Sequence, residues 1–186
     1  MSLRIIAGQW RGRKLQAPQG DTTRPTADRT RETLFSMLVS RLGSLEGLAV
    51  ADLFAGSGAL GLEALSRGAA SCIFVEQDPA AIRSLRSNIS NLRATSESDV
   101  RASSVLALGP AKAPLDLVML DPPYHTGAGS VALDKLVRLG WIGPATWISL
   151  ETAHDEEPRV KGLELVADRK VGKARLSLFT LPGGPE

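Results

Sequence analysis

The chain has little of several residue types, and each shortage excludes a class of protein. Its 186 residues include one cysteine, Cys72, so neither a disulfide within the chain nor a multi-cysteine zinc site can form. Cys72 lies in an apolar run, where we expect a buried and unreactive thiol. No apolar run approaches the roughly 20 residues of a membrane span, and residues 1–8 lack the pattern of a signal peptide. We therefore expect a cytoplasmic protein without a membrane partner.

Histidine is also scarce, with two residues in the chain. His154 stands among Asp155, Glu156 and Glu157, which resembles a metal cluster, but a solvated acidic loop is the better interpretation. His125 is interpreted as a residue that shapes a loop or contacts phosphate, in preference to a general base. We expect no metal site.

Positive charge is concentrated at the start of the chain. The whole chain has a net charge of +2, whereas residues 1–31 hold seven cations and two acidic residues, which gives +5 there and −3 elsewhere. A basic arm on a slightly acidic body indicates contact with a polyanion, and the alternative is a solvated basic surface. The candidate contact residues are Arg11, Arg13, Lys14, Arg24, Arg29 and Arg31.

From residue 45 onward, apolar runs alternate with helix-like stretches. Strands alternating with helices of about 10–15 residues predict a parallel sheet covered on both faces. The predicted strands are residues 48–53, 72–76, 100–103, 115–120 and 146–150. The predicted helices are residues 59–67, 79–92 (with Asp78 as N-cap) and 131–139.

The two ends of the chain depart from this alternation. Residues 163–171 and 174–181 flank a Gly-Lys pair and predict an antiparallel hairpin. Near the start, residues 4–6 and 13–15 predict a small hairpin, followed by a helix that Asp28 caps and that runs to about residue 42. Because such a front section is too short to bury its own core, we expect residues 1–44 to be an appendage of one domain spanning residues 1–186.

A glycine-rich segment, residues 52–61, lies between the first predicted strand and the first predicted helix. Its glycines satisfy the pattern G-x-G-x-x-G, and Glu76 ends the next predicted strand. A loop of this kind lets the backbone of Gly56, Ser57 and Gly58 lie against a ligand, and Glu76 can accept both hydroxyls of a ribose. The alternative is a glycine turn that only packs a strand on a helix.

Asp52 separates two classes of cofactor. A dinucleotide places its pyrophosphate at this turn, and a nearby carboxylate would repel it. S-adenosylmethionine has no phosphate, and an acidic residue at the strand end favours its ammonium and sulfonium groups. The sequence therefore favours S-adenosylmethionine over NAD.

The segment Asp121-Pro122-Pro123-Tyr124 follows the most apolar predicted strand. Because open α/β sheets bind ligands beyond the carboxyl ends of their strands, we expect this turn to face the same crevice as the glycine loop. The Asp121 carboxylate and the Pro122 carbonyl can accept both N–H bonds of an aromatic amino group and aim its lone pair at a methyl group. Tyr124 can stack on the base through its ring. The motif predicts methylation of an exocyclic amino group of a nucleic-acid base, and the alternative is a proline turn that merely ends a strand.

Residues 4–15, residues 24–35 and the two motifs above together resemble a known family, the bacterial 16S ribosomal RNA guanine-N2 methyltransferases of the RsmD type. The resemblance is specific from residue 3 to about residue 124 and weaker through Glu151 and the final hairpin. It implies an α/β fold, Rossmann-like and of class I, with a mostly parallel sheet, a C-terminal antiparallel hairpin and a small N-terminal basic extension.

The resemblance also implies a substrate and cofactor contacts. The substrate would be one guanine of 16S rRNA in the small ribosomal subunit or its late assembly intermediate. Thr26 would border the cofactor, the Gly56–Gly58 turn would hold its methionine part, and Glu76 would hold its ribose. The position near the cofactor adenine, commonly Asp or Asn in such enzymes, is Ser104 here, which departs from the family's pattern.

Other functions fit parts of the same pattern. A DNA methyltransferase acting on adenine N6 or cytosine N4 would use the same Asp-Pro-Pro-Tyr turn, although such enzymes usually carry an extra target-recognition region. A non-catalytic RNA-binding assembly factor could retain the fold, but the intact Asp121 and glycine loop argue against it. An NAD oxidoreductase is the least supported. Trp10 fits either packing within its hairpin or stacking on RNA.

Overall fold

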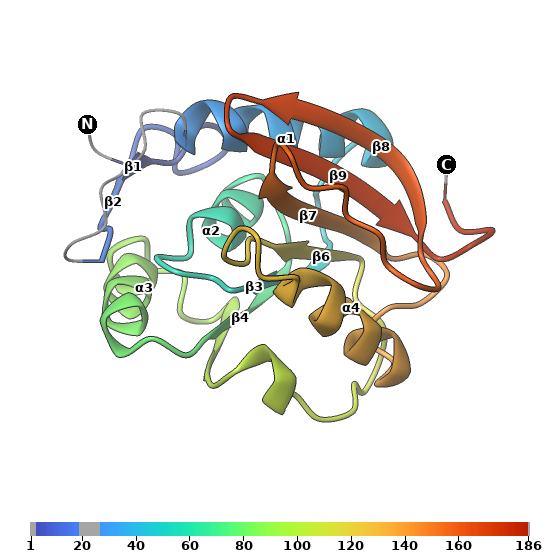
Figure 1. The fold of residues 1–186 in the computed structure, drawn as a ribbon. Coiled ribbons are helices and arrows are strands. Elements are labelled where there is room, and N and C mark those ends of the chain that lie inside the picture. The colour runs from blue at the N-terminus through green and yellow to red at the C-terminus, as the bar shows by residue number, and fades with distance from the viewer. Residues whose placement is uncertain (1–2, 19–26, 186) are drawn as a thin grey trace.

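The computed structural model describes residues 3–18 and 27–185. Its centre is a seven-stranded sheet in the order β5-β4-β3-β6-β7-β9-β8 (Figure 1). The strands are β3 (Ala49–Leu53), β4 (Ser71–Glu76), β5 (Ser98–Ala102), β6 (Leu117–Leu120), β7 (Trp147–Ala153), β8 (Glu164–Val171) and β9 (Ala174–Thr180). Strands β3 to β7 are parallel, and β9 runs antiparallel to both β7 and β8, which confirms the predicted architecture.

The helices lie on both faces of this sheet. They are α1 (Ala27–Leu42), α2 (Ala59–Ser66), α3 (Pro79–Asn91), α4 (Ala128–Arg138) and the short 3-10 helix η1 (Val105–Ala107). Asp78 caps α3 as predicted, because its carboxylate accepts a hydrogen bond from Ala81 N at 2.9 Å. Among the described residues, no helix is long and apolar enough to cross a membrane.

The order of the strands creates a switch point between β3 and β6. The chain adds β4 and β5 on one side of β3 and then returns to place β6 on the other side. Open α/β sheets form their ligand crevice beyond the carboxyl ends of the strands at such a point. The residues that follow β3 and β6 are therefore the first place to look for a site.

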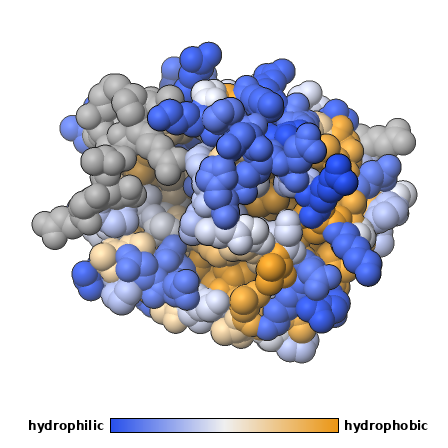
Figure 2. All heavy atoms as spheres, in the orientation of Figure 1, coloured by the Kyte–Doolittle hydropathy of each residue, from blue (hydrophilic) through white to orange (hydrophobic). Residues whose placement is uncertain are grey.

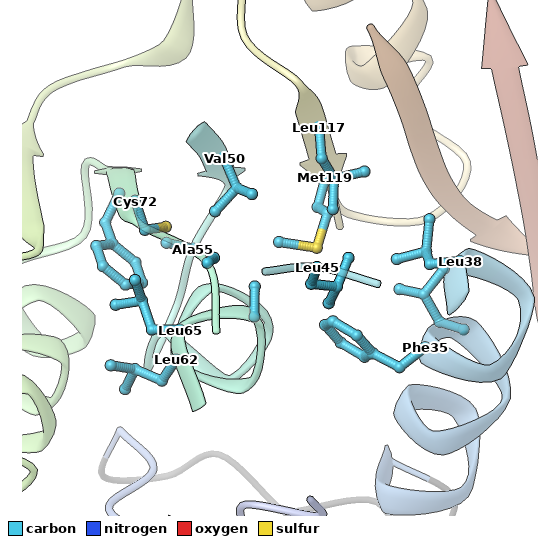
Figure 3. Packing of buried hydrophobic residues seen from close by; sticks show 14 of the residues in the cluster. Phe35, Leu38, Leu45, Val50, Ala55, Leu62, Leu65, Cys72, Leu117 and Met119 are labelled. Carbon is cyan, nitrogen blue, oxygen red and sulfur yellow. The ribbon is translucent and has the colours of Figure 1, made fainter. Parts of the chain in front are cut away.

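Each face of the sheet has its own hydrophobic cluster, because successive side chains of a strand point to opposite faces. Val50 and Met119 lie on the face that packs against Phe35 of α1 and Leu62 of α2 (Figure 3). The alternate residues of β3 and β6 pack on the other face with α4. By the same alternation, Asp52 lies on the face of Val50.

The N-terminal residues are joined to α2 by buried polar contacts. Strands β1 (Leu3–Arg4) and β2 (Lys14–Leu15) form the small antiparallel hairpin that the sequence predicted. Glu63 of α2 is fully buried and accepts hydrogen bonds from the backbone N–H groups of Ile6 at 2.8 Å and Ala7 at 3.1 Å. These bonds satisfy backbone donors that the hairpin's own ladder leaves unpaired.

The start of α1 differs from the prediction. Helix α1 begins at Ala27, so Asp28 is its second residue and not its N-cap. Its carboxylate accepts a hydrogen bond from Arg31 Nη2 at 3.0 Å. Arg31 also donates to the Arg4 carbonyl and lies 3.6 Å from Glu63, so it links α1 to β1 and α2.

The outer strand β8 is strongly charged. Figure 2 shows hydrophilic residues over α1 and the β8–β9 hairpin. Exposed charged residues of β8 include Glu164, Arg169 and Lys170. Charges on an edge strand discourage pairing with a second chain. The hairpin therefore ends the sheet with an edge strand that resists edge-to-edge association.

Candidate active site

The glycine loop and the Asp-Pro-Pro-Tyr turn lie side by side, as the sequence predicted. β3 and β6 pair in parallel, with Leu53 opposite Leu120 at their carboxyl ends. The backbone N–H of Asp121 points to the Leu53 carbonyl at 3.4 Å, which ties the two loops together. The structure thus brings both motifs to the switch point.

The three glycines of the loop have different structural roles. Gly58 has φ 87°, begins α2 as its N-cap, and would place a Cβ 2.4 Å from Leu85 Cδ1. A Cβ on Gly61 would lie 2.3 Å from the Phe74 ring, so that glycine lets α2 pack on β4. Gly56 has φ 57°, and a Cβ there would meet nothing within 4 Å. Packing therefore explains Gly58 and Gly61, and only Gly56 borders open space that a ligand can occupy.

Asp52 lies beneath the loop, and its carboxylate does not reach the surface. It is 1 % exposed and accepts a hydrogen bond from Gly61 N at 2.9 Å. Burial, aided by the charge of Glu76, raises the pKa of Asp52 to about 8, against the effect of the Gly61 hydrogen bond. This geometry therefore does not offer the direct ionic contact with a cofactor that the sequence predicted for Asp52. The residue holds the loop against α2, and a carboxyl with this pKa is mostly uncharged near pH 7.

Glu76 joins the end of β4 to the glycine loop. Its Oε1 accepts a hydrogen bond from Gly56 N at 2.8 Å, and its Oε2 accepts from Gln77 N and Asp78 N at 2.9 Å. A carboxylate offers about four lone-pair sites, so Oε1 retains capacity for a further donor. Glu76 thus shapes the loop and can still accept a hydroxyl.

Hydrogen bonds hold the backbone of Ser57 and the side chain of Ser104 in place. The Ser57 carbonyl accepts a hydrogen bond from Asn88 Nδ2 at 2.9 Å. The same side-chain amide also donates to the Gln16 carbonyl and accepts from Gln16 N. Ser104, half-buried after β5, caps η1 by accepting from Leu106 N at 3.2 Å. Asn88 is 1 % exposed, and its hydrogen bonds join the N-terminal residues to the glycine loop. The sequence analysis did not identify this residue.

The turn after β6 contains one contact that the sequence did not indicate. Asp121 is exposed, Pro122 is buried and Tyr124 is half-buried. The Tyr124 hydroxyl donates a hydrogen bond to Glu151 Oε2 at 2.6 Å. His125, next in the chain, has φ 61°, a rare backbone conformation for a residue with a side chain. Glu151 lies in β7 directly after the part of the strand that pairs with β6. A polar residue that follows the mostly apolar run of residues 147–150 was the signal from which the sequence could have identified it.

The cations predicted to contact RNA fall into three groups. Arg11, Arg13, Lys14 and Arg29 are exposed, and Arg13 donates to the Asn91 carbonyl at 2.9 Å. Arg31 is 4 % exposed and lies 3.6 Å from the buried Glu63, so in this geometry its guanidinium group is not open to a phosphate. Arg24 and Thr26 lie outside the described residues.

Comparison with known proteins identifies relatives along nearly the whole chain. The profile of the family described as conserved hypothetical protein 95 matches residues 3–180. Ribosomal RNA small subunit methyltransferase D of Escherichia coli (strain K12) is 41% identical over 150 residues, which are 81% of this chain and 74% of that protein.

Solved structures agree with this relationship. The methyltransferase yhhF of Escherichia coli has a TM-score of 0.84 and 36% identity, covering 97% of this chain and 98% of its own. The Thermus thermophilus 16S rRNA N2 G1207 methyltransferase RsmC, solved with AdoMet and guanosine, shares the fold with a TM-score of 0.68 at 23% identity, covering 97% of this chain and 49% of its own. The fold is therefore that of a class I methyltransferase, as predicted, and the chain belongs to the conserved hypothetical protein 95 family, that of the small-subunit ribosomal RNA methyltransferases D.

Proposed function

We propose that this chain transfers a methyl group from S-adenosylmethionine to the N2 amino group of a guanine in 16S rRNA, within the small ribosomal subunit or its late assembly intermediate. The observation that carries the proposal is the position of the glycine loop and the Asp121–Tyr124 turn at the carboxyl ends of paired strands β3 and β6. Membership of the family supports the same rRNA substrate.

The residues around Gly56 fit S-adenosylmethionine. Open space above Gly56 lets the backbone of residues 56–58 lie against the methionine part, and Oε1 of Glu76 can accept a ribose hydroxyl. Ser104, beyond the end of β5, and Thr26 would border the rest of the cofactor. S-adenosylmethionine supplies an electrophilic methyl group and needs no metal ion.

The turn after β6 would hold the guanine. The Asp121 carboxylate and the Pro122 carbonyl accept the two N–H bonds of the amino group, so its lone pair points toward the methyl carbon. The Tyr124 ring stacks on the base, an interaction worth about 1–3 kcal/mol. The nitrogen would form a bond to the methyl carbon as the carbon–sulfur bond breaks and leaves the thioether S-adenosylhomocysteine, and the proton that the nitrogen then loses would pass to the Asp121 carboxylate or to water. No strong base is required beforehand, because the nitrogen becomes acidic only as the methyl group arrives.

The test is transfer of labelled methyl to small subunits that lack the modification, followed by mapping of the modified base. We expect label in one guanine of 16S rRNA, and none after Asp121→Ala, which should bind S-adenosylmethionine as the wild type does. Asp134→Ala on the exposed face of α4 is the matched control and should retain full transfer. Label in duplex DNA instead of rRNA would establish a DNA methyltransferase. Absence of transfer to any nucleic acid, with subunit binding intact, would establish an assembly factor.

A further inference from the structure

A second pocket lies away from the candidate active site, between the N-terminal hairpin and the end of α3. Its volume is about 530 Å³, within the range of small-ligand sites. It is lined by Gln9, Trp10, Arg13, Asn91, Leu92, Arg93 and Glu97. The Glu97 carbonyl accepts a hydrogen bond from Cys72 N near the start of β4. Since Glu76 ends the same strand, the pocket is roughly 13 Å from the cofactor edge of the sheet.

One wall of this pocket is held rigidly. The Gly8 backbone lies so close to the end of α2 that a Cβ would be 1.9 Å from the Ser66 carbonyl oxygen. Gln9 N donates to that carbonyl at 2.8 Å, and Trp10 N donates to Ser66 Oγ at 3.0 Å. The hairpin turn is therefore fixed on α2, and the position of Trp10 does not depend on a ligand.

The opposite wall contains a strained cation. Arg93, two residues beyond the last residue of α3, has φ 55°. Its N–H bonds to the Ser90 carbonyl and the Ala94 N–H bonds to the Ile89 carbonyl, which is the Schellman arrangement. Glycine is the usual residue at this position because it has no Cβ to oppose a positive φ. A positive φ at an arginine costs free energy that a glycine would not, and such strain commonly accompanies a functional role of the side chain.

The floor contains an unsatisfied acceptor. Oε2 of Glu97 is buried and has no hydrogen-bond partner among the described residues. A buried acceptor is normally paired, and this oxygen is closed to solvent, so an N–H group of a ligand can pair with it once the Glu97 side chain turns toward the pocket that it lines. The pocket thus combines an aromatic ring, two guanidinium groups and an acceptor for N–H, which together match a nucleotide.

We propose that this pocket binds one nucleotide of the RNA substrate at a distance from the base that is methylated. The base stacks on Trp10 and donates an N–H hydrogen bond to the Glu97 carboxylate, whose side chain turns toward it, and Arg13 and Arg93 hold its phosphate. The inference rests on the proposed function, since RNA is the substrate there. A nucleotide held here offsets the cost of moving the target base out of its stack.

Tryptophan fluorescence tests the stacking. Trp141 and Trp147 are 6 % and 5 % exposed, whereas Trp10 is half-buried in the pocket wall. Guanosine monophosphate and a short single-stranded RNA should quench the emission, the RNA at concentrations at least tenfold lower, and inorganic phosphate should not. Trp10→Phe should lose the quenching but bind the RNA. Equal quenching in Trp10→Phe, or none in the wild type, would overturn the proposal.

Arg93→Gly separates ligand binding from folding. Glycine suits φ 55°, so the variant should melt at the wild-type temperature or above, while its affinity for the RNA falls at least fivefold. Glu97→Gln should also bind the RNA more weakly. Arg86→Ala, an exposed arginine on α3 outside the pocket, is the matched control and should bind normally. Wild-type affinity in Arg93→Gly and Glu97→Gln would refute the pocket's role.

Methylation of small subunits by the wild type is measured in parallel. If the wild type transfers methyl groups and the pocket variants bind RNA as the wild type does, only the inference about this pocket is refuted. Nucleotide binding in the pocket without any transfer would remove only the proposed methylation.

Discussion

At the scale of single residues, Tyr124 has two parts with different tasks. Its ring is available to stack on a base, and its hydroxyl bonds to Glu151 at 2.6 Å. The bond connects the turn after β6 to the end of β7, so Glu151 orients the ring and is a positioning residue. Because the side chain is only half-buried, we expect this bond to contribute near the lower end of the range for hydrogen bonds to charged groups.

Tyr124→Phe should therefore lower the turnover number by about tenfold, equivalent to about 1.4 kcal/mol. Glu151→Gln should cause a similar loss, and the double variant should be little worse than either single one. Tyr124→Ala should be far more damaging, because it removes the stacking ring. Additive losses in the double variant, measured by initial rates on small subunits, would show that the two side chains act independently.

Asp52 gives stability a predictable dependence on pH. Its pKa is about 8 in the folded protein and about 3.9 in an unfolded chain. Between these values the folded state holds a proton that the unfolded state has released, so the free energy of unfolding falls as pH rises toward 8 and then levels off.

Asp52→Asn keeps an oxygen acceptor for Gly61 N and cannot ionise. It should match the wild type below about pH 4 and become the more stable protein as pH rises to 8.5, by up to about 1.4 kcal/mol for each pKa unit removed. Urea unfolding at several pH values measures the difference. A difference that does not change with pH would mean that Asp52 titrates normally.

At the scale of elements, the glycine loop shows what sequence reasoning can resolve. The spacing of its glycines and the apolar runs around it predicted the strand, the turn and the helix correctly. It could not tell a glycine needed for packing from one needed for a ligand, because that depends on Leu85 and Phe74, which approach from other elements. The same limit hid Glu151 and Asn88, whose partners are distant in sequence.

Gly56→Ala tests the ligand role of the loop directly. A Cβ at Gly56 meets no atom within 4 Å, so the main cost to folding is the positive φ, about 1–2 kcal/mol. We expect an additional loss of S-adenosylmethionine affinity of tenfold or more by calorimetry. Gly140→Ala is the matched control, since Gly140 also has a positive φ, 83°, and open space around its Cβ. Equal cofactor affinity in the two variants would place the cofactor elsewhere.

Glu63 fastens the N-terminal hairpin to α2 and should be costly to remove. It is fully buried, accepts two backbone N–H bonds from the hairpin, and pairs with Arg67 at 2.9 Å. Glu63→Ala leaves those two donors unpaired and removes the buried carboxylate that faces Arg31 and Arg67, so we expect a loss of about 3–5 kcal/mol in urea unfolding. Asp134→Ala breaks an exposed pair with Arg138 and should cost less than about 1 kcal/mol. Similar losses in both variants would show that Glu63 is not a fastening point.

At the scale of the whole molecule, the cations of the basic N-terminus lie in two different environments, which the composition could not distinguish. Residues 1–31 contain seven cations, and the sequence analysis predicted that most of them contact RNA. Arg31 is instead a buried side chain that pairs with Asp28 and Glu63. Leu3, Ile5 and Leu15 also share the main hydrophobic cluster. We therefore propose that residues 1–44 fold as part of one domain with the rest of the chain.

This division predicts opposite behaviour for cations that look alike in sequence. Arg11 and Lys14 are exposed on the hairpin, and each phosphate contact with a single strand contributes about 0.7 to the slope of log K against log salt. Arg11→Ala with Lys14→Ala should therefore weaken subunit binding, reduce that slope by about 1.4 units, and leave the melting temperature and cofactor affinity unchanged. Arg31→Ala should lower the melting temperature and leave the salt slope as it is, because a buried guanidinium cannot reach a phosphate. An unchanged slope in the hairpin variant would show that Arg11 and Lys14 are only a solvated surface, and a reduced slope in Arg31→Ala would show that the arm opens to bind RNA.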